Sequence, residues 1–120
     1  MIRFLRHLVF ASHGFILALK RERHLRFHLV IGALAIFLGI YFDIPRLEWM
    51  FLLLAIFLVI ICELMNTAIE KVVDYISVDI HPMAKFCKDV ASSAVLSACI
   101  LSLLIGYFIF FNPLKTLLLD

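Results

Sequence analysis

The chain has 120 residues, of which 65% are hydrophobic, and its formal net charge is +2. Soluble domains use about 45–50% apolar residues, so this composition argues against a soluble globular protein and indicates the bilayer as solvent. The basic residues flank the apolar segments and form no separate basic face, which argues against a nucleic-acid partner. We expect a single all-α membrane domain over residues 1–120.

Residues 2–20 have the pattern of an amphipathic helix. At 100° per residue, apolar side chains such as Phe4 and Leu8 share one face, and basic side chains such as Arg6 lie on the opposite face. We expect this helix to lie in the membrane interface with its basic face towards anionic headgroups. A surface helix packed on the rest of the protein is compatible with the same pattern.

Three later segments are apolar and long enough to cross a bilayer, which takes about 20 residues in a helix. They are predicted at about residues 25–42, 47–73 and 83–111. A turn at residues 43–46 separates the first two, because Pro45 lacks an amide donor and disfavours helix in the residue before it. Pro82 suits the first turn of the third helix, and Asn112 with Pro113 is expected to end it.

The distribution of lysine and arginine predicts the orientation of these crossings. Residues 1–26 hold six of these side chains and three more flank the link at residues 74–88, whereas the first link and the C-terminal tail hold one each. By the positive-inside rule, the N-terminus and the second link are cytoplasmic and the C-terminus is outside. Three crossings agree with termini on opposite sides.

The second crossing contains a carboxylate at an unusual depth. An apolar run from Trp49 to Cys62 is too short to span a bilayer, so the helix must continue past Glu63. Glu63 then lies about 21 Å from Trp49, still at hydrocarbon depth, where an ionisable side chain is costly and by default marks a functional site. The alternative is an interhelical hydrogen bond from a serine of the third crossing, such as Ser92 or Ser93.

Four polar residues continue this helix at spacings of three, four and four: Glu63, Asn66, Glu70 and Asp74. The spacing places them on one face, which begins inside the membrane and rises into the cytoplasm. Other charged candidates stand near the cytoplasmic ends of the first and third crossings: Glu22, Lys85, Lys88 and Asp89.

Carboxylates, an amide and lysines at a cytoplasmic membrane surface suit phosphoryl transfer. Carboxylates are hard ligands for Mg²⁺, which takes one or two of them and shares its other positions with substrate phosphates. A positioned carboxylate can accept a proton from an alcohol, and lysines stabilise phosphate charge. The residues therefore predict transfer from Mg-ATP to a lipid hydroxyl.

A non-enzymatic helical subunit that binds cations or conducts protons is the alternative from a different class. A proton path would need acids through the whole depth of the membrane, whereas every intramembrane acid here is expected on the cytoplasmic side. This favours the kinase. The histidines at positions 7, 13, 24 and 28 are interpreted as interfacial or packing residues rather than ligands.

The sequence of residues 63–74, ELMNTAIEKVVD, resembles the signature of the prokaryotic diacylglycerol kinase family. Residues 81–85 and 88–92 resemble the family's second block, and Glu22 stands where the family has its N-terminal glutamate. The resemblance covers residues 3 to about 111. It implies a small integral kinase of the bacterial inner membrane, with a surface helix and three transmembrane helices per subunit, that forms a homotrimer with active sites shared between subunits.

The resemblance also implies roles for individual residues. Glu63 would be the general base on the lipid hydroxyl. Glu22 and Glu70 would hold the Mg²⁺ ions that bridge the ATP phosphates. Asn66 would orient Glu63 or the γ-phosphate.

Two further roles and the choice of lipid depend on the same resemblance. Lys88 would contact phosphate, and Asp89 would help position the adenine end or Lys88. Residues 22–28 and 81–85 look more like the branch that phosphorylates undecaprenol, since the diacylglycerol branch tends to have an acidic residue where His28 stands. We therefore expect undecaprenol as acceptor, with diacylglycerol as the alternative.

Overall fold

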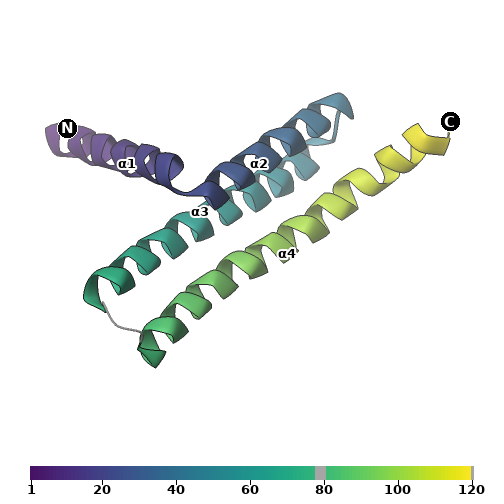
Figure 1. Cartoon of the computed structure of the whole chain (residues 1–120). Helices are drawn as coiled ribbons and strands as arrows, with labels where there is room; N and C mark the ends of the chain where they lie inside the picture. Colours follow the sequence, from purple (N-terminus) through teal and green to yellow (C-terminus); the bar gives the residue numbers. More distant parts are fainter. Residues whose placement is uncertain (78–80, 120) are drawn as a thin grey trace.

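The computed structural model describes residues 1–77 and 81–119, and within them it contains four α-helices and no strand. The helices are α1 (Ile2–Arg21), α2 (Arg23–Tyr41), α3 (Arg46–Ile76) and α4 (Pro82–Leu119). In Figure 1, α3 lies alongside α2 and α4, whereas α1 leaves the bundle at an angle. The prediction of an all-α protein is confirmed. Residues 78–80, within the predicted second link, lie outside the described residues.

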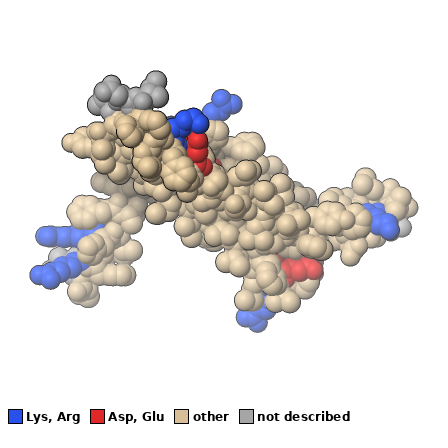
Figure 2. Space-filling view, turned by 90° about the horizontal axis from the view of Figure 1, so that it is seen from below, with Lys and Arg blue, Asp and Glu red and all other residues tan. Residues whose placement is uncertain are grey.

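Three of the helices, α2, α3 and α4, are long and apolar enough to cross a membrane. Figure 2 shows Lys, Arg, Asp and Glu atoms towards the margins of one face, while other residues cover its centre. Large apolar side chains such as Phe37, Leu54 and Leu103 are exposed on the bundle. Such surfaces suit contact with lipid or with another subunit. The prediction of three apolar helices of spanning length is confirmed.

A single residue, Glu22, separates α1 from α2, and its backbone is extended, with φ −101° and ψ 114°. Arg26 donates from Nη1 to the carbonyl oxygens of Leu19 at 3.0 Å and Lys20 at 2.9 Å. A cation at this end satisfies carbonyls that no helical amide reaches and complements the helix dipole. The contact fixes the direction in which α1 leaves and holds Glu22 at the junction.

Most of α1 does not pack on the rest of the chain. The apolar side chains of Phe4, Leu8 and Ile16 are exposed along it. A helix with basic and apolar faces has this arrangement when its apolar face meets the membrane interface instead of the bundle. The described contacts therefore favour a surface helix over one packed along its length on the other three.

The end of α4 differs from the sequence prediction. The helix does not end at Asn112 and Pro113 but continues through Pro113 to Leu119. A proline removes its own amide hydrogen bond and crowds the preceding turn, but it can kink a helix without ending it, and the leucines that follow are good helix formers. The Thr116 hydroxyl also donates to the Asn112 carbonyl at 3.1 Å, within the same turn. The predicted end of this helix was wrong for these reasons.

Glycines allow α2 to approach α3 closely. Leu25, Gly32 and Gly39 are buried at seven-residue spacing on one face of α2. A methyl group added at Gly32 would lie 3.0 Å from Ile56 Cγ2, and one at Gly39 would lie 2.9 Å from Trp49 Cη2. Small residues let helix backbones come together where lipid supplies no hydrophobic drive for association. The two glycines therefore set the separation of the helices.

One face of α3 is buried over several turns, at Leu52, Ala55, Val59 and Glu63. Towards the α2–α3 turn, Leu52 joins Ile44, Ile109 and Phe110 in an apolar cluster. Further along, the Ser102 hydroxyl of α4 donates to the Ala55 carbonyl at 3.2 Å. The apolar packing thus lies at one end of this face, and Glu63 lies towards the other.

We predict that Gly39→Ala destabilises the protein, because the added methyl group would displace the Trp49 ring. Overpacking of this kind costs about 1–3 kcal/mol, which exceeds the roughly 1 kcal/mol gained when alanine replaces glycine in a helix. The measurement is the midpoint of thermal unfolding in one detergent. Gly14→Ala is the control, since no atom lies within 4 Å of its added methyl group. A midpoint for Gly39→Ala at or above that of the wild type would contradict this interpretation.

Candidate active site

Glu63 is a charged side chain buried inside the bundle, with 5% of its surface exposed. Its Oε1 lies 3.0 Å from Nε2 of His28, which α2 presents across the α2–α3 contact. The alternative partners suggested by the sequence are not used. The Ser93 hydroxyl donates to the carbonyl of Val90 in its own helix at 2.7 Å. The alternative of a hydrogen bond from Ser93 to Glu63 is therefore not what the structure shows, since the partner of Glu63 is His28.

His28 was interpreted from the sequence as an interfacial or packing residue rather than a ligand, and the structure places it in a contact between helices. It follows the buried Leu25 by three positions and precedes the buried Gly32 by four, so it belongs to the inward face of α2. That spacing was available in the sequence. A polar residue on the inward face of one crossing, opposite a carboxylate in the next, is the signal that could have identified the pair.

Asn66 and Glu70 extend the same face of α3. Asn66 Nδ2 donates to Glu70 Oε1 at 3.2 Å, one turn further along the helix. Among the residues that the structure describes, no group bonds to the buried Oδ1 of Asn66. A buried carbonyl oxygen without a donor is costly, so this atom is available to a ligand.

Glu22 reaches α3 from the α1–α2 junction. Its Oε1 lies 3.2 Å from Nζ of Lys71, the residue that follows Glu70 in α3. The two side chains differ in exposure, with 19% for Glu22 and 59% for Lys71. The structure therefore brings Glu22 beside the turn of α3 that carries Glu70, and a metal site shared by the two glutamates stays a prediction.

The charged residues at the start of α4 divide into two pairs. Lys88 contacts Oδ1 of Asp74 and so connects α4 to the polar face of α3. Lys85 pairs instead with Asp89 on its own helix at 3.1 Å, and both side chains are exposed. Lys88 thus joins the candidate site, whereas the contact that the structure gives Asp89 is to Lys85 and not to α3.

The described residues, 1–77 and 81–119, contain no cluster of three or more His, Cys, Asp or Glu side chains that could hold a metal ion. Mg²⁺ rarely needs such a cage, because it usually takes one or two carboxylates and fills its other positions with water and substrate phosphates. The carboxylates of Glu22 and Glu70 and the unpaired Oδ1 of Asn66 are hard oxygen donors. This donor set fits Mg²⁺ that arrives with a nucleotide.

An apolar groove of about 610 Å³ lies between α2, α3 and α4. His28 and Cys99 line one end, beside Glu63, and Leu38 and Phe110 line the other. Most of the remaining lining is aliphatic. The groove has the character expected of a site for a long hydrocarbon chain whose polar end meets the carboxylate.

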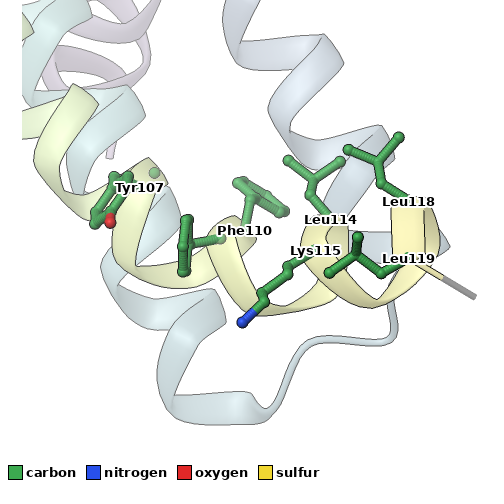
Figure 3. A pocket seen from close by; sticks show the side chains of 8 residues that line it. Tyr107, Phe110, Leu114, Lys115, Leu118 and Leu119 are labelled. Atoms are coloured by element: carbon green, nitrogen blue, oxygen red, sulfur yellow. The ribbon is translucent and has the colours of Figure 1, made fainter.

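A second hollow, of about 440 Å³, follows α4 alone near its C-terminal end. Figure 3 shows its labelled side chains in order along the helix, from Tyr107 at one side to Leu118 and Leu119 at the other. Its eight lining residues include no carboxylate. They follow the C-terminal part of α4 from Gly106 to Leu119, and Phe110 among them belongs to the apolar cluster at the α2–α3 turn, so this hollow is not part of the candidate site.

The model of the prokaryotic diacylglycerol kinase family matches residues 9–110. The chain belongs to this family. The undecaprenol kinase of Bacillus subtilis (strain 168) is 36% identical over 112 residues, which cover 93% of this chain and 91% of that protein. The diacylglycerol kinase of Helicobacter pylori (strain J99) is 37% identical over 94 residues, which cover 78% and 73% of the two chains. The diacylglycerol kinase of Escherichia coli (strain K12) is 35% identical over 71 residues, which cover 59% and 58%.

These relatives are named as kinases for undecaprenol or diacylglycerol. The prediction that the chain is an enzyme, a membrane lipid kinase, is confirmed. The matched region, residues 9–110, contains all six residues that were assigned roles. The roles of these residues stay predictions.

Proposed function

We propose that this protein transfers the γ-phosphate of Mg-ATP to the hydroxyl of undecaprenol and produces undecaprenyl phosphate. The observation that carries the proposal is the position of Glu63. It is a buried carboxylate that continues the inward face of an apolar helix, beside a groove for a hydrocarbon chain. A group in this position can receive a lipid alcohol from the membrane on one side and a soluble nucleotide on the other.

The reaction needs a base at the alcohol. Glu63 accepts the hydroxyl proton as the alcohol oxygen attacks the γ-phosphorus. The new bond is the O–P bond of the phosphate ester, and the bond that breaks joins the γ-phosphorus to the bridging oxygen of ADP. The proton then resides on the Glu63 carboxyl until it passes to solvent, and ADP leaves with the electron pair of the broken bond.

Glu22 and Glu70 are proposed to hold Mg²⁺, with Asn66 orienting Glu63 or the γ-phosphate. When bound, Mg²⁺ neutralises charge on the phosphate oxygens. Lys88 connects α4 to the polar face of α3 and is proposed to contact phosphate. Asp89 pairs with Lys85 rather than Lys88, which favours a role at the adenine end over a role in holding Lys88.

We propose a homotrimer in the bacterial inner membrane, with the N-terminus and the active site cytoplasmic and the C-terminus outside. Support comes from the exposed apolar surface of the bundle and from the projection of α1 away from it. Three slender crossings leave much apolar surface exposed, which neighbouring subunits would cover while completing the sites. The N-terminal concentration of basic residues supports the orientation.

The acceptor is proposed to be undecaprenol, in part because a bare alcohol needs fewer hydrogen-bond donors from the site than a diacylglycerol does. Diacylglycerol has ester carbonyls beside its hydroxyl, and these need donors when they leave water. The hydroxyls of Ser93 and Ser102 already donate to backbone carbonyls of Val90 and Ala55. A bare alcohol on a branched hydrocarbon makes no such demand. The longer match to the undecaprenol kinase favours the same acceptor, and diacylglycerol is the alternative.

We predict that Glu63→Gln lowers turnover at least about a hundredfold and leaves Mg-ATP binding nearly unchanged, since an amide keeps the shape but accepts no proton. Radiolabel transfer from ATP to lipid measures the rate, and nucleotide titration measures binding. Glu48→Gln is the matched control, because Glu48 lies in the first turn of the same helix, far from the site. A variant at position 63 with most of the wild-type turnover would remove Glu63 from the role of base.

Glu22→Gln and Glu70→Gln are each expected to shift the Mg²⁺ dependence of turnover to higher concentration, by about tenfold, because each removes a charged ligand. The measurement is initial rate against free Mg²⁺ at fixed ATP, with Glu48→Gln again as control. If the rate falls while the Mg²⁺ and ATP curves keep their midpoints, the two glutamates do not hold the metal.

The lipid preference is tested directly by the acceptor. In one detergent, we expect kcat/KM to be higher for a polyprenol than for a diacylglycerol of matched solubility, because the groove is apolar and the hydroxyl of Ser102 in its lining already donates to the Ala55 carbonyl. A clear preference for diacylglycerol would overturn the choice of undecaprenol and leave the assignment as a lipid kinase intact.

A further inference from the structure

The contact between His28 and Glu63 joins two helices at the candidate site. The His28 Nε2 to Glu63 Oε1 distance is 3.0 Å, and the side chains are 19% and 7% exposed. Cys99 Sγ of α4 lies 4.0 Å from the same nitrogen, so the imidazole is enclosed by all three crossings. His28 and Cys99 both line the apolar groove. The imidazole therefore contacts the Glu63 carboxylate where it lines one end of the groove.

The position of His28 is set by backbone packing. Gly32, one turn further along α2, meets the Ile56 side chain so closely that an added methyl group would lie 3.0 Å from it. Leu25, one turn before His28, is fully buried. Fixed packing on both sides leaves the imidazole little freedom to withdraw from Glu63. The contact is therefore held in place by the packing of α2 on α3.

A hydrogen-bond donor at one oxygen of a carboxylate limits the rotation of that carboxylate. An Nε2–H of His28 donates to Oε1 of Glu63 and restricts rotation of the carboxylate about its last bond. In low-dielectric surroundings such a bond is stronger than in water. The proton of an alcohol is transferred efficiently only when donor and acceptor are held in the reacting geometry, so free rotation of the carboxylate would lower the rate.

We infer that His28 is a positioning residue for this kinase. It holds the Glu63 carboxylate at the end of the apolar groove, so that the remaining lone pairs of Glu63 face the lipid hydroxyl. His28 itself takes no proton from the alcohol and binds no phosphate. This inference rests on the proposed function, because it assigns His28 a role through the base that the proposed reaction requires.

The first test compares His28→Leu with His28→Gln. Leucine removes the donor, and we expect kcat to fall about ten- to a hundredfold, as for loss of a hydrogen bond to a charged group, with KM for Mg-ATP within about twofold. Glutamine can place its amide nitrogen near the position of Nε2, and we expect it to retain kcat within about threefold. His24→Leu, on the exposed side of α2, is the control.

Wild-type kcat in His28→Leu, or equal losses in the leucine and glutamine variants, would overturn the positioning role. A wild-type chain that phosphorylates no lipid alcohol would instead overturn the proposed function, and the positioning role with it. The two failures are therefore distinguished by the wild-type measurement.

A second readout does not depend on activity. In the full chain labelled with ¹⁵N-histidine, Glu63→Gln should shift the Nε2 resonance of His28, because the acceptor loses its charge. Glu48→Gln should leave that resonance in place. An unchanged His28 resonance in Glu63→Gln would overturn the contact itself, even if His28→Leu failed to fold.

Discussion

A carboxylate within the apolar part of a membrane protein needs a polar partner, because no water is present to solvate it. Glu63 has this partner in His28, which lies on a different helix. The contact requires α2 and α3 to approach closely, and Gly32 and Gly39 permit that approach. The packing of the bundle and the chemistry of the site are thus connected, since a wider helix separation would leave the carboxylate without its donor.

One face of α3 contributes both to the packing of the bundle and to the candidate site. Its buried residues follow one another at three- and four-residue spacing from Leu52 to Glu63, and the same spacing continues through Asn66 and Glu70. The face is apolar where it packs against α4 and polar where it meets the candidate nucleotide site. Because a helix is rigid over this length, the packing end fixes the position of the reactive end.

Hydropathy and residue spacing predicted the crossings and the polar face of α3, because both depend only on the order of residues within one helix. The partner of Glu63 depends on the register between two helices, and in α2 that register is set by contacts such as Gly39 with Trp49. Residue spacing indicates that His28 lies on the inward face of α2, but it does not determine which residue of α3 lies opposite. The end of α4 was missed for a different reason, since a proline near the last turns removes too little hydrogen bonding to stop a helix that leucines continue. The roles of Lys88 and Asp89 depend on how a nucleotide would bind, which the order of residues in the chain does not describe.

The junction at Glu22 has a mechanical consequence. One residue joins the surface helix to the first crossing, and Arg26 of that crossing binds the last carbonyls of α1. No flexible linker separates the two helices, so a change in the tilt or depth of α1 at the membrane surface is transmitted directly to α2. Glu22 is the residue at which the two helices meet. The position of the Glu22 carboxylate is therefore tied to the direction in which α1 leaves α2.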